Sequence, residues 1–276
     1  MSERFFAKLN KATSGPLVMG ILNVTPDSFS DGGRFVRPET LRSRVFEMLE
    51  AGADVIDVGG ESTRPGAQPV SIELELDRVM PVVEWLRRET DALISVDTSK
   101  PMVMKEAIQH DVDMINDIHA LQASGALDAV AQSDVAVCLM HHPGGLEAMH
   151  QCSGYPQGVV KAVQSFLMER VRVCEAHGVS SDRVVLDPGF GFGKTHEENV
   201  ELFKALNTLT DQPYPILAGV SRKRMIGALT GVDSPDERVL GSAVAASLAM
   251  MKGARIVRVH DVAETVQALN LTRALG

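Results

Sequence analysis

Residues 184–195 read VVLDPGFGFGKT, an apolar run that ends in a carboxylate and passes into a glycine-rich loop. The Gly-Lys-Thr at its end is similar to a phosphate-binding loop, which requires four residues between its first glycine and the Gly-Lys pair. Gly189 leaves only three residues before Gly193, because Pro188 occupies the required position. The stretch therefore does not predict a nucleotide site. Its informative feature is Asp187, which stands at the end of an apolar strand.

Val184–Asp187 is one of eight short apolar runs that are rich in β-branched residues. The other seven are Leu17–Leu22, Asp54–Val58, Leu93–Asp97, Met114–Ile118, Val135–Met140, Ile216–Val220 and Ile256–Val259. Between them lie segments with apolar residues three and four positions apart, such as 41–49, 74–86 and 159–171, which predict amphipathic helices. Such strands pair in parallel, in a closed barrel or an open doubly wound sheet. Eight units in roughly 250 residues favour an α/β fold, a (β/α)₈ TIM barrel forming a single domain over the whole chain.

The composition excludes several classes of protein. The chain has 276 residues, 45% of them hydrophobic and 23% charged, with a net charge of −9 and a pI near 5.4. This charge is unfavourable for wrapping nucleic acid or lying on an anionic membrane, but it permits a local basic pocket. No segment approaches the roughly 18 uninterrupted apolar residues that would cross a bilayer. Three cysteines without a CxxC pair, and an N-terminus without the apolar run of a signal peptide, predict a reduced cytoplasmic protein.

The carboxyl ends of the eight runs are unusually polar. In a TIM barrel these ends surround the active site, so the last residues of each run are the candidates for chemistry. They are Asn23, Asp57, Asp97, Asn116 with Asp117, Asp187, Arg258 and His260. Any single acid can be a helix N-cap or turn residue, and for Asp117 both interpretations are open. Together they predict a ligand rich in hydrogen-bond donors, because unpaired buried carboxylates are costly.

A cluster of cations follows the seventh run. In residues 219–227, GVSRKRMIG, Ser221 is expected at a helix N-cap with three cations in the first helical turn. Cations are unfavourable at a helix N-terminus. We interpret Arg222 and Arg224 as a solvated basic face, and Lys223 as a functional residue close to the acids.

Arg258 and His260 lie at the end of the eighth run. Strand alternation turns their side chains to the same face. A phosphate site near strands seven and eight recurs in this fold. A lone histidine is more often structural, but beside Arg258 it predicts an anion clamp.

The segments after the first two runs are long and rich in Gly, Ser and Pro. They cover residues 23–33 and 59–66, and both carry ionic side chains, which predicts mobile lids over a reaction centre. Ordinary turn chemistry explains their Gly-Gly and Pro-Gly pairs. It does not explain Arg64 or Phe29.

Eight ordered motifs make the sequence resemble the dihydropteroate synthase family over residues 17–262. They are MGILNVTPDSFSDGG, DVIDVGGESTRPG, ISVDTSKP, INDI, CLMHH, LDPGFGFGK, GVSRKRMIG and RVHDV. The resemblance implies a TIM barrel that joins p-aminobenzoate to 6-hydroxymethyl-7,8-dihydropterin pyrophosphate, giving 7,8-dihydropteroate and pyrophosphate. It further implies loss of pyrophosphate before attack by the amine, Mg²⁺ as cofactor, and a homodimer. The partners are then small-molecule substrates, with no nucleic acid and no membrane.

The resemblance also implies roles for particular residues. The pterin is bound by Asp97, Asn116, Met140, Asp187, Lys223 and Arg258; Asp187 would accept from an adjacent ring N–H and amino group. Pyrophosphate is held by Asn23, Arg64, Arg258 and His260, and Asn23 supports Mg²⁺ together with phosphate oxygens and water. The contacts to p-aminobenzoate are Thr63, Pro65, Phe190, and Ser221 or nearby helix amides. The catalytic residues are Lys223, Arg64, Asp31 and Asp57, of which the two acids stabilise a developing cation.

The sequence departs from the family pattern in three places. Arg224 stands where relatives can carry serine, which affects the expected binding of the p-aminobenzoate carboxylate. Residues 141–151, HHPGGLEAMHQ, differ from the usual motif, and His119 follows the INDI motif. The histidines of this segment and Cys152 match no standard set of zinc ligands. None of these departures removes a proposed pterin or pyrophosphate ligand.

Two other functions remain open. A pterin-binding methyltransferase barrel would share Asp97, Asn116 and Asp187. It would not need Arg64 or the pairing of Arg258 with His260, so these cations favour the synthase. A catalytically silent pterin-binding paralogue would keep the same pocket without turnover, which only an activity measurement decides.

Overall fold

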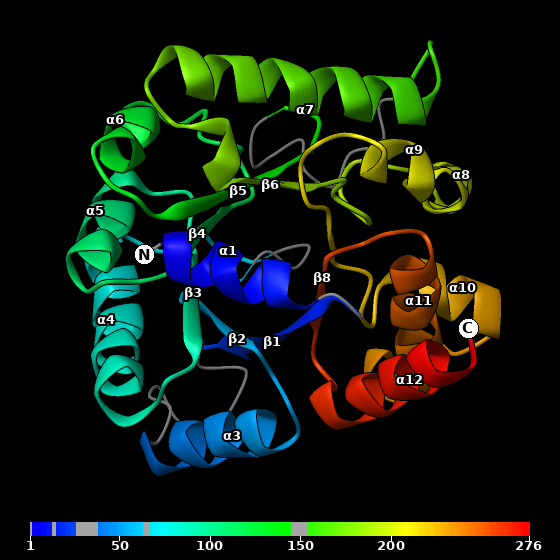
Figure 1. Cartoon of the computed structure of the whole chain (residues 1–276), viewed down its shortest axis with the longest axis horizontal. Helices are drawn as coiled ribbons and strands as arrows, with labels where there is room; N and C mark the ends of the chain where they lie inside the picture. Colours follow the sequence, from blue (N-terminus) through cyan, green and yellow to red (C-terminus); the bar gives the residue numbers. More distant parts are fainter. Residues whose placement is uncertain (1, 13–14, 26–37, 63–66, 145–153) are drawn as a thin grey trace.

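The computed structural model of the chain describes residues 2–12, 15–25, 38–62, 67–144 and 154–276. Its centre is a sheet of eight parallel strands in the order β6-β5-β4-β3-β2-β1-β8-β7 (Figure 1). The strands are β1 (Leu17–Asn23), β2 (Val55–Gly59), β3 (Leu93–Asp97), β4 (Met114–Asp117), β5 (Ala136–Met140), β6 (Val184–Asp187), β7 (Leu217–Ala218) and β8 (Ile256–Val259). A parallel bridge between Leu186 and Ile216, and a hydrogen bond of 3.0 Å from Leu186 N to Pro215 O, bring β6 against β7. The predicted barrel is confirmed, with a shorter seventh strand than expected.

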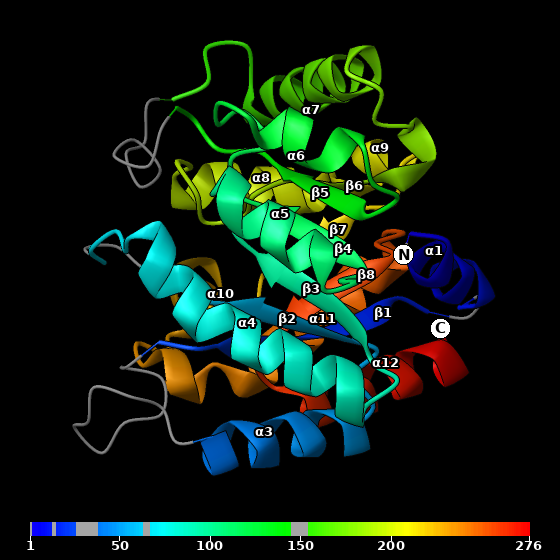
Figure 2. The ribbon, with the colours of Figure 1, turned by 90° about the vertical axis from the view of Figure 1, so that its left-hand side faces the viewer.

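Helices surround the barrel on its outer face, except for α1, which covers one end of it (Figures 1 and 2). They are α1 (Ser2–Lys11), α3 (Pro38–Glu50), α4 (Ile72–Glu89), α5 (Pro101–Gln109), α6 (Ala126–Ala131), α7 (Val159–Ala176), α8 (His196–Lys204), α9 (Leu206–Thr210), α10 (Arg224–Thr230), α11 (Val239–Met251) and α12 (Val262–Leu275). Each strand is followed by at least one helix, as predicted, and the three quoted amphipathic segments lie in α3, α4 and α7. No helix in the described ranges has both the length and the apolar character that a membrane crossing requires.

The strand side chains divide between two apolar layers. In β1, Val18 and Leu22 pack in the layer between the sheet and the helices, whereas Leu17 and Met19 face the barrel interior. This division follows from the two-residue period of a strand. Each strand therefore contributes to both layers, which explains why the eight runs are continuously apolar.

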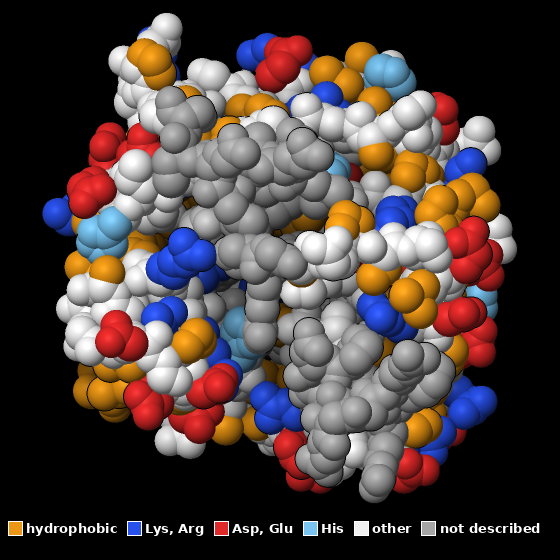
Figure 3. All heavy atoms as spheres, turned by 180° about the vertical axis from the view of Figure 1, so that it is seen from behind, with side chains coloured by type: hydrophobic (Ala, Val, Ile, Leu, Met, Phe, Trp, Pro, Cys, Tyr) orange, Lys and Arg blue, Asp and Glu red, His pale blue; other side chains and the backbone are white. Residues whose placement is uncertain are grey.

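Helix α1 closes the amino end of the barrel, where it lies across the strands in Figure 1. Phe5 and Leu9 are 0% and 2% exposed and complete the interior apolar layer. Lys8 Nζ pairs with Asp54 Oδ1 at 3.0 Å, and Arg255 donates to the Leu9 carbonyl oxygen at 2.5 Å. No pattern in the sequence predicted this packing. Figure 3 shows the molecule from the opposite side, which is the side on which the strands end.

Candidate active site

The strand register brings several polar strand ends into one row. Asn23 pairs with Gly59, Gly59 with Asp97, and Asp97 with Asn116. A Cβ on Gly59 would stand 3.7 Å from Asn23 Oδ1 and 3.6 Å from Asp97 Cβ, so the glycine leaves space between these two side chains. Asp57 lies two residues before Gly59 and therefore on the same face of β2.

Arg258 of β8 joins two of the acids. Its Nε donates to Asp57 Oδ2 at 2.6 Å, and its Nη2 donates to Asp97 Oδ2 at 2.7 Å. Asn116 Nδ2 donates to the same oxygen of Asp57 at 3.3 Å. Asp57 is 0% exposed, and its Oδ1 has no hydrogen-bond partner among the described residues. Four predicted site residues therefore form one cluster, which includes an unsatisfied buried acceptor.

The charges in this cluster depend on one another. Burial raises the pKa of Asp97 to about 7, although the Arg258 guanidinium counteracts the rise. Burial lowers the pKa of Arg258, but Asp57 and Asp97 raise it by more, so the guanidinium keeps its charge. One cation is thus shared by two acids, and the burial of Asp97 opposes its ionisation while Arg258 favours it.

Asp187 is buried at the end of β6 and is followed by a sharp turn. Its Oδ1 accepts a hydrogen bond from Gly189 N at 2.7 Å. Burial raises the pKa of Asp187, and the Lys223 ammonium partly counteracts this. Gly189 has φ +68°, and a Cβ at this position would stand 1.9 Å from the His141 carbonyl oxygen, so only glycine fits. Glycine is therefore required at position 189, because two backbone segments approach each other closely there.

The side chain of Lys194 holds the same loop by donating to backbone carbonyl oxygens. It is 6% exposed, and its Nζ donates to Gly189 O at 2.8 Å and to Phe192 O at 3.1 Å, with His141 O at 3.5 Å. Burial lowers the pKa of Lys194 to about 7. Thr195 then caps α8, its Oγ accepting from the backbone at 3.1 Å. Lys194 and Thr195 of the Gly-Lys-Thr sequence therefore stabilise the loop and the start of α8. The sequence did not predict this role, because backbone carbonyl acceptors leave no signal in a sequence.

Lys223 is the N-cap residue of α10 and reaches toward the loop that follows β6. Its Nζ donates to the Phe190 carbonyl oxygen and lies 4.4 Å from the centroid of the Phe192 ring. Burial lowers the pKa of Lys223 to about 8, while the Asp187 carboxylate counteracts the decrease. A Cβ on Gly191 would stand 3.0 Å from Lys223 Cδ, so this glycine makes room for the lysine side chain.

The two phenylalanines of this loop have different surroundings. Phe190 is 1% exposed and packs on Phe203 of α8, with ring centroids 5.7 Å apart. Phe192 is partly buried and packs against Met140, which is itself 3% exposed. The structure therefore places the Phe190 ring in the core and places Phe192 beside Lys223 and Met140. The glycines with positive φ turn the chain between the two residues. The expected contact of Phe190 with p-aminobenzoate stays a prediction.

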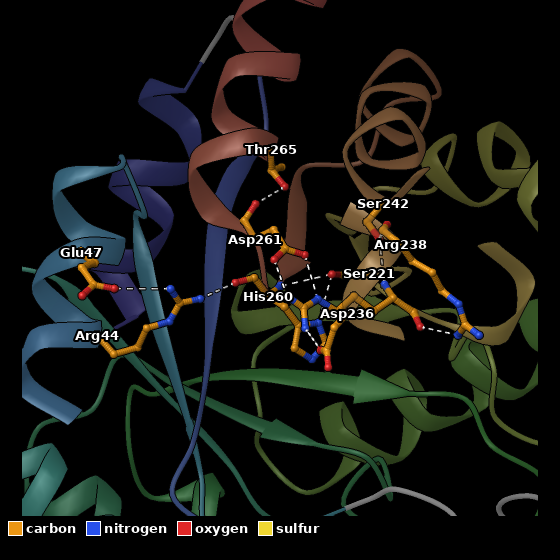
Figure 4. A network of polar contacts seen from close by, with 10 residues as sticks. Arg44, Glu47, Ser221, Asp236, Arg238, Ser242, His260, Asp261 and Thr265 are labelled. Atoms are coloured by element: carbon orange, nitrogen blue, oxygen red, sulfur yellow. Dashed lines mark hydrogen bonds and ion pairs between the residues drawn. The ribbon is translucent and has the colours of Figure 1, made fainter. Parts of the chain in front are cut away.

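Ser221 differs from its predicted local role. It is not the N-cap of α10, because that position belongs to Lys223. Its hydroxyl instead lies 3.0 Å from His260 Nδ1 and accepts from His260 N at 3.2 Å (Figure 4). This contact joins the segment after β7 to the segment after β8.

Arg222 also differs from its prediction as part of a solvated basic face. Its Nε and Nη2 donate to the two carboxylate oxygens of Asp261 at 2.9 and 2.6 Å. The prediction is therefore wrong for Arg222, because a carboxylate that is distant in the sequence receives its guanidinium. Arg224 is exposed, in agreement with the same prediction.

Asp117 is a turn residue. It is 0% exposed, and its carboxylate accepts from His119 N at 2.8 Å and from Leu121 N at 2.7 Å. Of the two interpretations that the sequence left open, the structure supports the local one.

Several predicted residues lie outside the described ranges. They are Asp31, Thr63, Arg64 and Pro65, together with Phe29, His150 and Cys152. Within the described ranges, no group of three or more His, Cys, Asp and Glu side chains is placed to hold a metal ion.

A parallel barrel with buried acids, an amide and two cations near its carboxyl end is typical of a barrel enzyme that binds a polar ligand. Comparison with protein families places the chain in such a class, because the family described as pterin binding enzyme matches residues 19–260.

Individual relatives define the family more narrowly. The dihydropteroate synthase of Haemophilus influenzae is 48% identical over 262 residues, which cover 95% of this chain and 94% of the relative. That of Escherichia coli is 47% identical over 261 residues, covering 95% and 92%. The chain belongs to the dihydropteroate synthase family of pterin-binding enzymes.

Solved structures agree with this assignment. Xanthomonas albilineans dihydropteroate synthase with 4-aminobenzoic acid superposes with a TM-score of 0.89 at 50% identity, covering 94% of this chain and 93% of the other. The same enzyme in complex with 7,8-dihydropteroate gives a TM-score of 0.86 at 47% identity, with the same coverage.

Proposed function

We propose that this protein condenses 6-hydroxymethyl-7,8-dihydropterin pyrophosphate with p-aminobenzoate to form 7,8-dihydropteroate and pyrophosphate. The similar structures that contain 4-aminobenzoic acid and 7,8-dihydropteroate support the identity of the substrates. The observation that carries the proposal for this chain is the cluster of Arg258 with Asp57, Asp97 and Asn116 at the carboxyl end of the barrel.

The pterin would be recognised mainly by acids and amides. A dihydropterin ring presents an N–H and an amino group side by side, which one carboxylate can accept together, and Asp187 is our candidate for this contact. Asp97 and Asn116 would meet the other ring nitrogens, while Lys223 would donate to the acceptors of the ring. Met140 would pack against the flat surface of the pterin.

The pyrophosphate would be held by Asn23, Arg258 and His260, together with Arg64. Asp57 and Asp97 engage two of the five N–H groups of the Arg258 guanidinium. The remaining N–H groups would serve the phosphate oxygens. The same side chain would thus fix two acids against the pterin and draw charge from the leaving group.

The reaction would begin when the C–O bond to pyrophosphate breaks and both electrons leave with the phosphate oxygen. The resulting carbocation is delocalised into the electron-rich pterin, and Asp57 and Asp31 would stabilise it. The amine of p-aminobenzoate then forms the C–N bond and loses a proton. Groups placed in advance around the departing charge lower the barrier without a covalent enzyme intermediate.

The residues fit a Mg²⁺ ion that is carried mostly by the substrate. Mg²⁺ is often bound through one or two protein ligands together with substrate phosphates and water. Asn23 at the end of β1 is half-buried and offers one amide oxygen. When bound, Mg²⁺ would neutralise charge on the pyrophosphate.

The p-aminobenzoate site would lie beside Lys223. Phe192 is the ring that packs near this lysine and Met140, so we propose it as the wall for the aromatic substrate. Ser221, together with Thr63 and Pro65, would complete the contacts.

We propose that two copies of the chain associate through helices α10, α11 and α12. Leu240, Val244, Leu248 and Met251 of α11 are 77%, 49%, 44% and 66% exposed and recur every three or four residues along one face. Leu229 of α10 and Leu271 and Leu275 of α12 add exposed apolar side chains on the neighbouring helices. We call these seven residues the α11 surface. Contiguous exposed apolar side chains mark protein contacts, and the proposed occupant is the same surface of a second copy.

We further propose that the enzyme works in the cytoplasm on these small molecules. Cys138 and Cys174 are free and buried, which suits a reducing compartment.

The test is an assay for pyrophosphate release by the purified protein with both substrates and Mg²⁺. We expect release that depends on p-aminobenzoate, together with formation of dihydropteroate. If calorimetry shows tight pterin binding but no pyrophosphate appears, the silent pterin-binding reading is correct instead. Methyl transfer from methyltetrahydrofolate to a corrinoid, without pyrophosphate release, would support the methyltransferase reading.

A further inference from the structure

We propose that Arg222 and Asp261 are positioning residues for catalysis: their ion pair fixes the segment that carries Ser221 and Lys223 against the segment that carries Arg258 and His260. This inference rests on the proposed function, because it assigns the pair to the same reaction.

The ion pair connects two segments directly beside proposed substrate contacts. Figure 4 shows Asp261 together with Ser221 and His260, which belong to these segments. Arg222 donates from Nε to Asp261 Oδ2 at 2.9 Å and from Nη2 to Asp261 Oδ1 at 2.6 Å, so the contact is bidentate. The side chain of Asp261 is 10% exposed and that of Arg222 is 24% exposed, so solvent screens the pair only in part. Arg222 precedes Lys223, and Asp261 follows His260.

The backbone of Arg222 has an uncommon conformation. Its φ is +57°, in the left-handed region that residues with a Cβ rarely adopt. Such a conformation persists where surrounding contacts hold it. It sits between Ser221 and Lys223, so the directions of these two side chains depend on it.

Ser242 of helix α11 and Arg238, which precedes this helix, hold the backbone of Arg222. Arg222 N donates to Ser242 Oγ at 2.8 Å, and the Arg222 carbonyl oxygen accepts from Arg238 Nη1 at 2.9 Å. Ser242 Oγ in turn donates to Arg238 O at 2.6 Å. Helix α11 therefore supports the backbone of Arg222 from one side. The side chain of Arg222 links this backbone to Asp261, which follows β8.

The position of this link matters because of the bond that breaks. Lys223 would contact the pterin and His260 the pyrophosphate, so the scissile C–O bond lies between the groups that the two segments provide. Misplacement by about 1 Å can reduce the rate of an enzyme by about 100-fold. The pair should therefore affect turnover more than the binding of pterin alone.

The variants Arg222→Gly, Arg222→Ala, Arg222→Lys and Asp261→Asn separate the backbone from the ion pair. Glycine accepts the left-handed conformation without strain but removes the side chain, whereas alanine removes the side chain and keeps the strain. Lysine keeps the charge but not the bidentate geometry. Arg172→Ala is the matched control, because Arg172 pairs with Glu169 at 2.6 Å on the exposed face of α7.

We expect Arg222→Gly and Asp261→Asn to lower kcat by roughly 10- to 100-fold while the pterin Kd changes less than about threefold. The double variant should lose no more than either single variant, since the two side chains act as a unit. Arg172→Ala should retain full activity. Unchanged kcat in Arg222→Gly would overturn the proposal, as would a parallel loss of kcat, pterin affinity and Tm, which indicates a purely structural role.

A wild-type protein without turnover would refute the proposed function. Amide hydrogen exchange tests the role of the ion pair even in that case. The proposal requires faster exchange at residues 221–223 and 260–261 together, in both Arg222→Gly and Asp261→Asn, with unchanged exchange in the barrel strands. Wild-type exchange rates in these two segments would refute it.

Discussion

Arg258 Nε donates to Asp57 Oδ2 at 2.6 Å and so joins β8 to β2 across the strand between them. The two residues are 201 positions apart in the sequence, and Asp57 is fully buried. A carboxylate at such a position requires a partner, because burial removes its hydration. The contact explains how the barrel retains an acid near its centre.

Removing this cation should destabilise the fold. Arg258→Met leaves Asp57 buried without its ion pair, and we expect the free energy of unfolding to fall by about 3–5 kcal/mol. Urea denaturation measures this change. Adding Asp57→Asn to Arg258→Met should restore part of the loss, and a double variant that is no more stable than the single one would argue against the pairing.

Asp187→Asn should weaken the binding of the pterin substrate. The substitution replaces one acceptor oxygen by a donor, and we expect a loss of about 1.5–3 kcal/mol, or roughly 10- to 150-fold in Kd by calorimetry. Asp182→Asn is the matched control, because Asp182 is exposed on the turn that precedes β6. Equal affinities of the Asp187 variant and the wild type would remove Asp187 from the pterin site.

Pterin affinity should fall as the pH rises above about 8. Burial lowers the pKa of Lys223 to about 8, so its ammonium is charged below this pH and neutral above it. If the charge is needed for binding, Kd should rise as the pH increases from 8 to 10, as measured by calorimetry. Lys223→Arg should bind with an affinity that is independent of pH over this range, because arginine stays protonated. The same decline in both proteins would assign it to another group.

The two phenylalanines of the loop after β6 should behave differently. Phe190→Ala empties a core position and should cost about 3–5 kcal/mol of unfolding free energy. Phe192→Ala should cost much less stability but raise the KM for p-aminobenzoate, since we propose this ring as the wall of that site. Steady-state kinetics and urea denaturation of both variants measure these effects. A larger KM effect for Phe190→Ala would support the sequence-based assignment of Phe190 to the p-aminobenzoate site.

The double variant Val244→Glu/Leu248→Glu should separate the proposed homodimer. Burying carboxylates in the α11 surface is unfavourable by several kcal/mol, so the dimer Kd should rise by about 100-fold or more. Analytical ultracentrifugation measures the change. Met102→Glu is the control, because Met102 is 54% exposed on α5, on the other side of the barrel in Figure 1. If the double variant sediments like the wild type, another surface forms the contact.

The strand ends were predictable, but their contacts were not. The position of Asp97 and Asp187 at strand ends follows from apolar runs that stop at an acid, and parallel strands bring such ends together. The partner of each acid depends on the strand register and on the reach of long side chains. No local pattern therefore indicated that Arg258 would bind two acids, or that Arg222 would bind Asp261.

The conformation of the loop after β6 was also not predictable from the sequence. A sequence of glycines predicts a turn, but the direction of each following side chain depends on φ values that are positive at Gly189, Gly191 and Gly193. For that reason the sequence did not indicate that the Phe190 ring packs on α8 while the Phe192 ring lies beside Lys223, and it showed no acceptor for Lys194.

By itself, the sequence determined the order of eight strand–helix units and the polar character of their carboxyl ends, because hydrophobic periodicity and strand termination are local properties of the chain. Only the tertiary structure decided which cation meets which acid, which phenylalanine faces Lys223, and that α1 closes the far end of the barrel. These choices depend on contacts between residues far apart in the chain, and such contacts exist only after the barrel has closed.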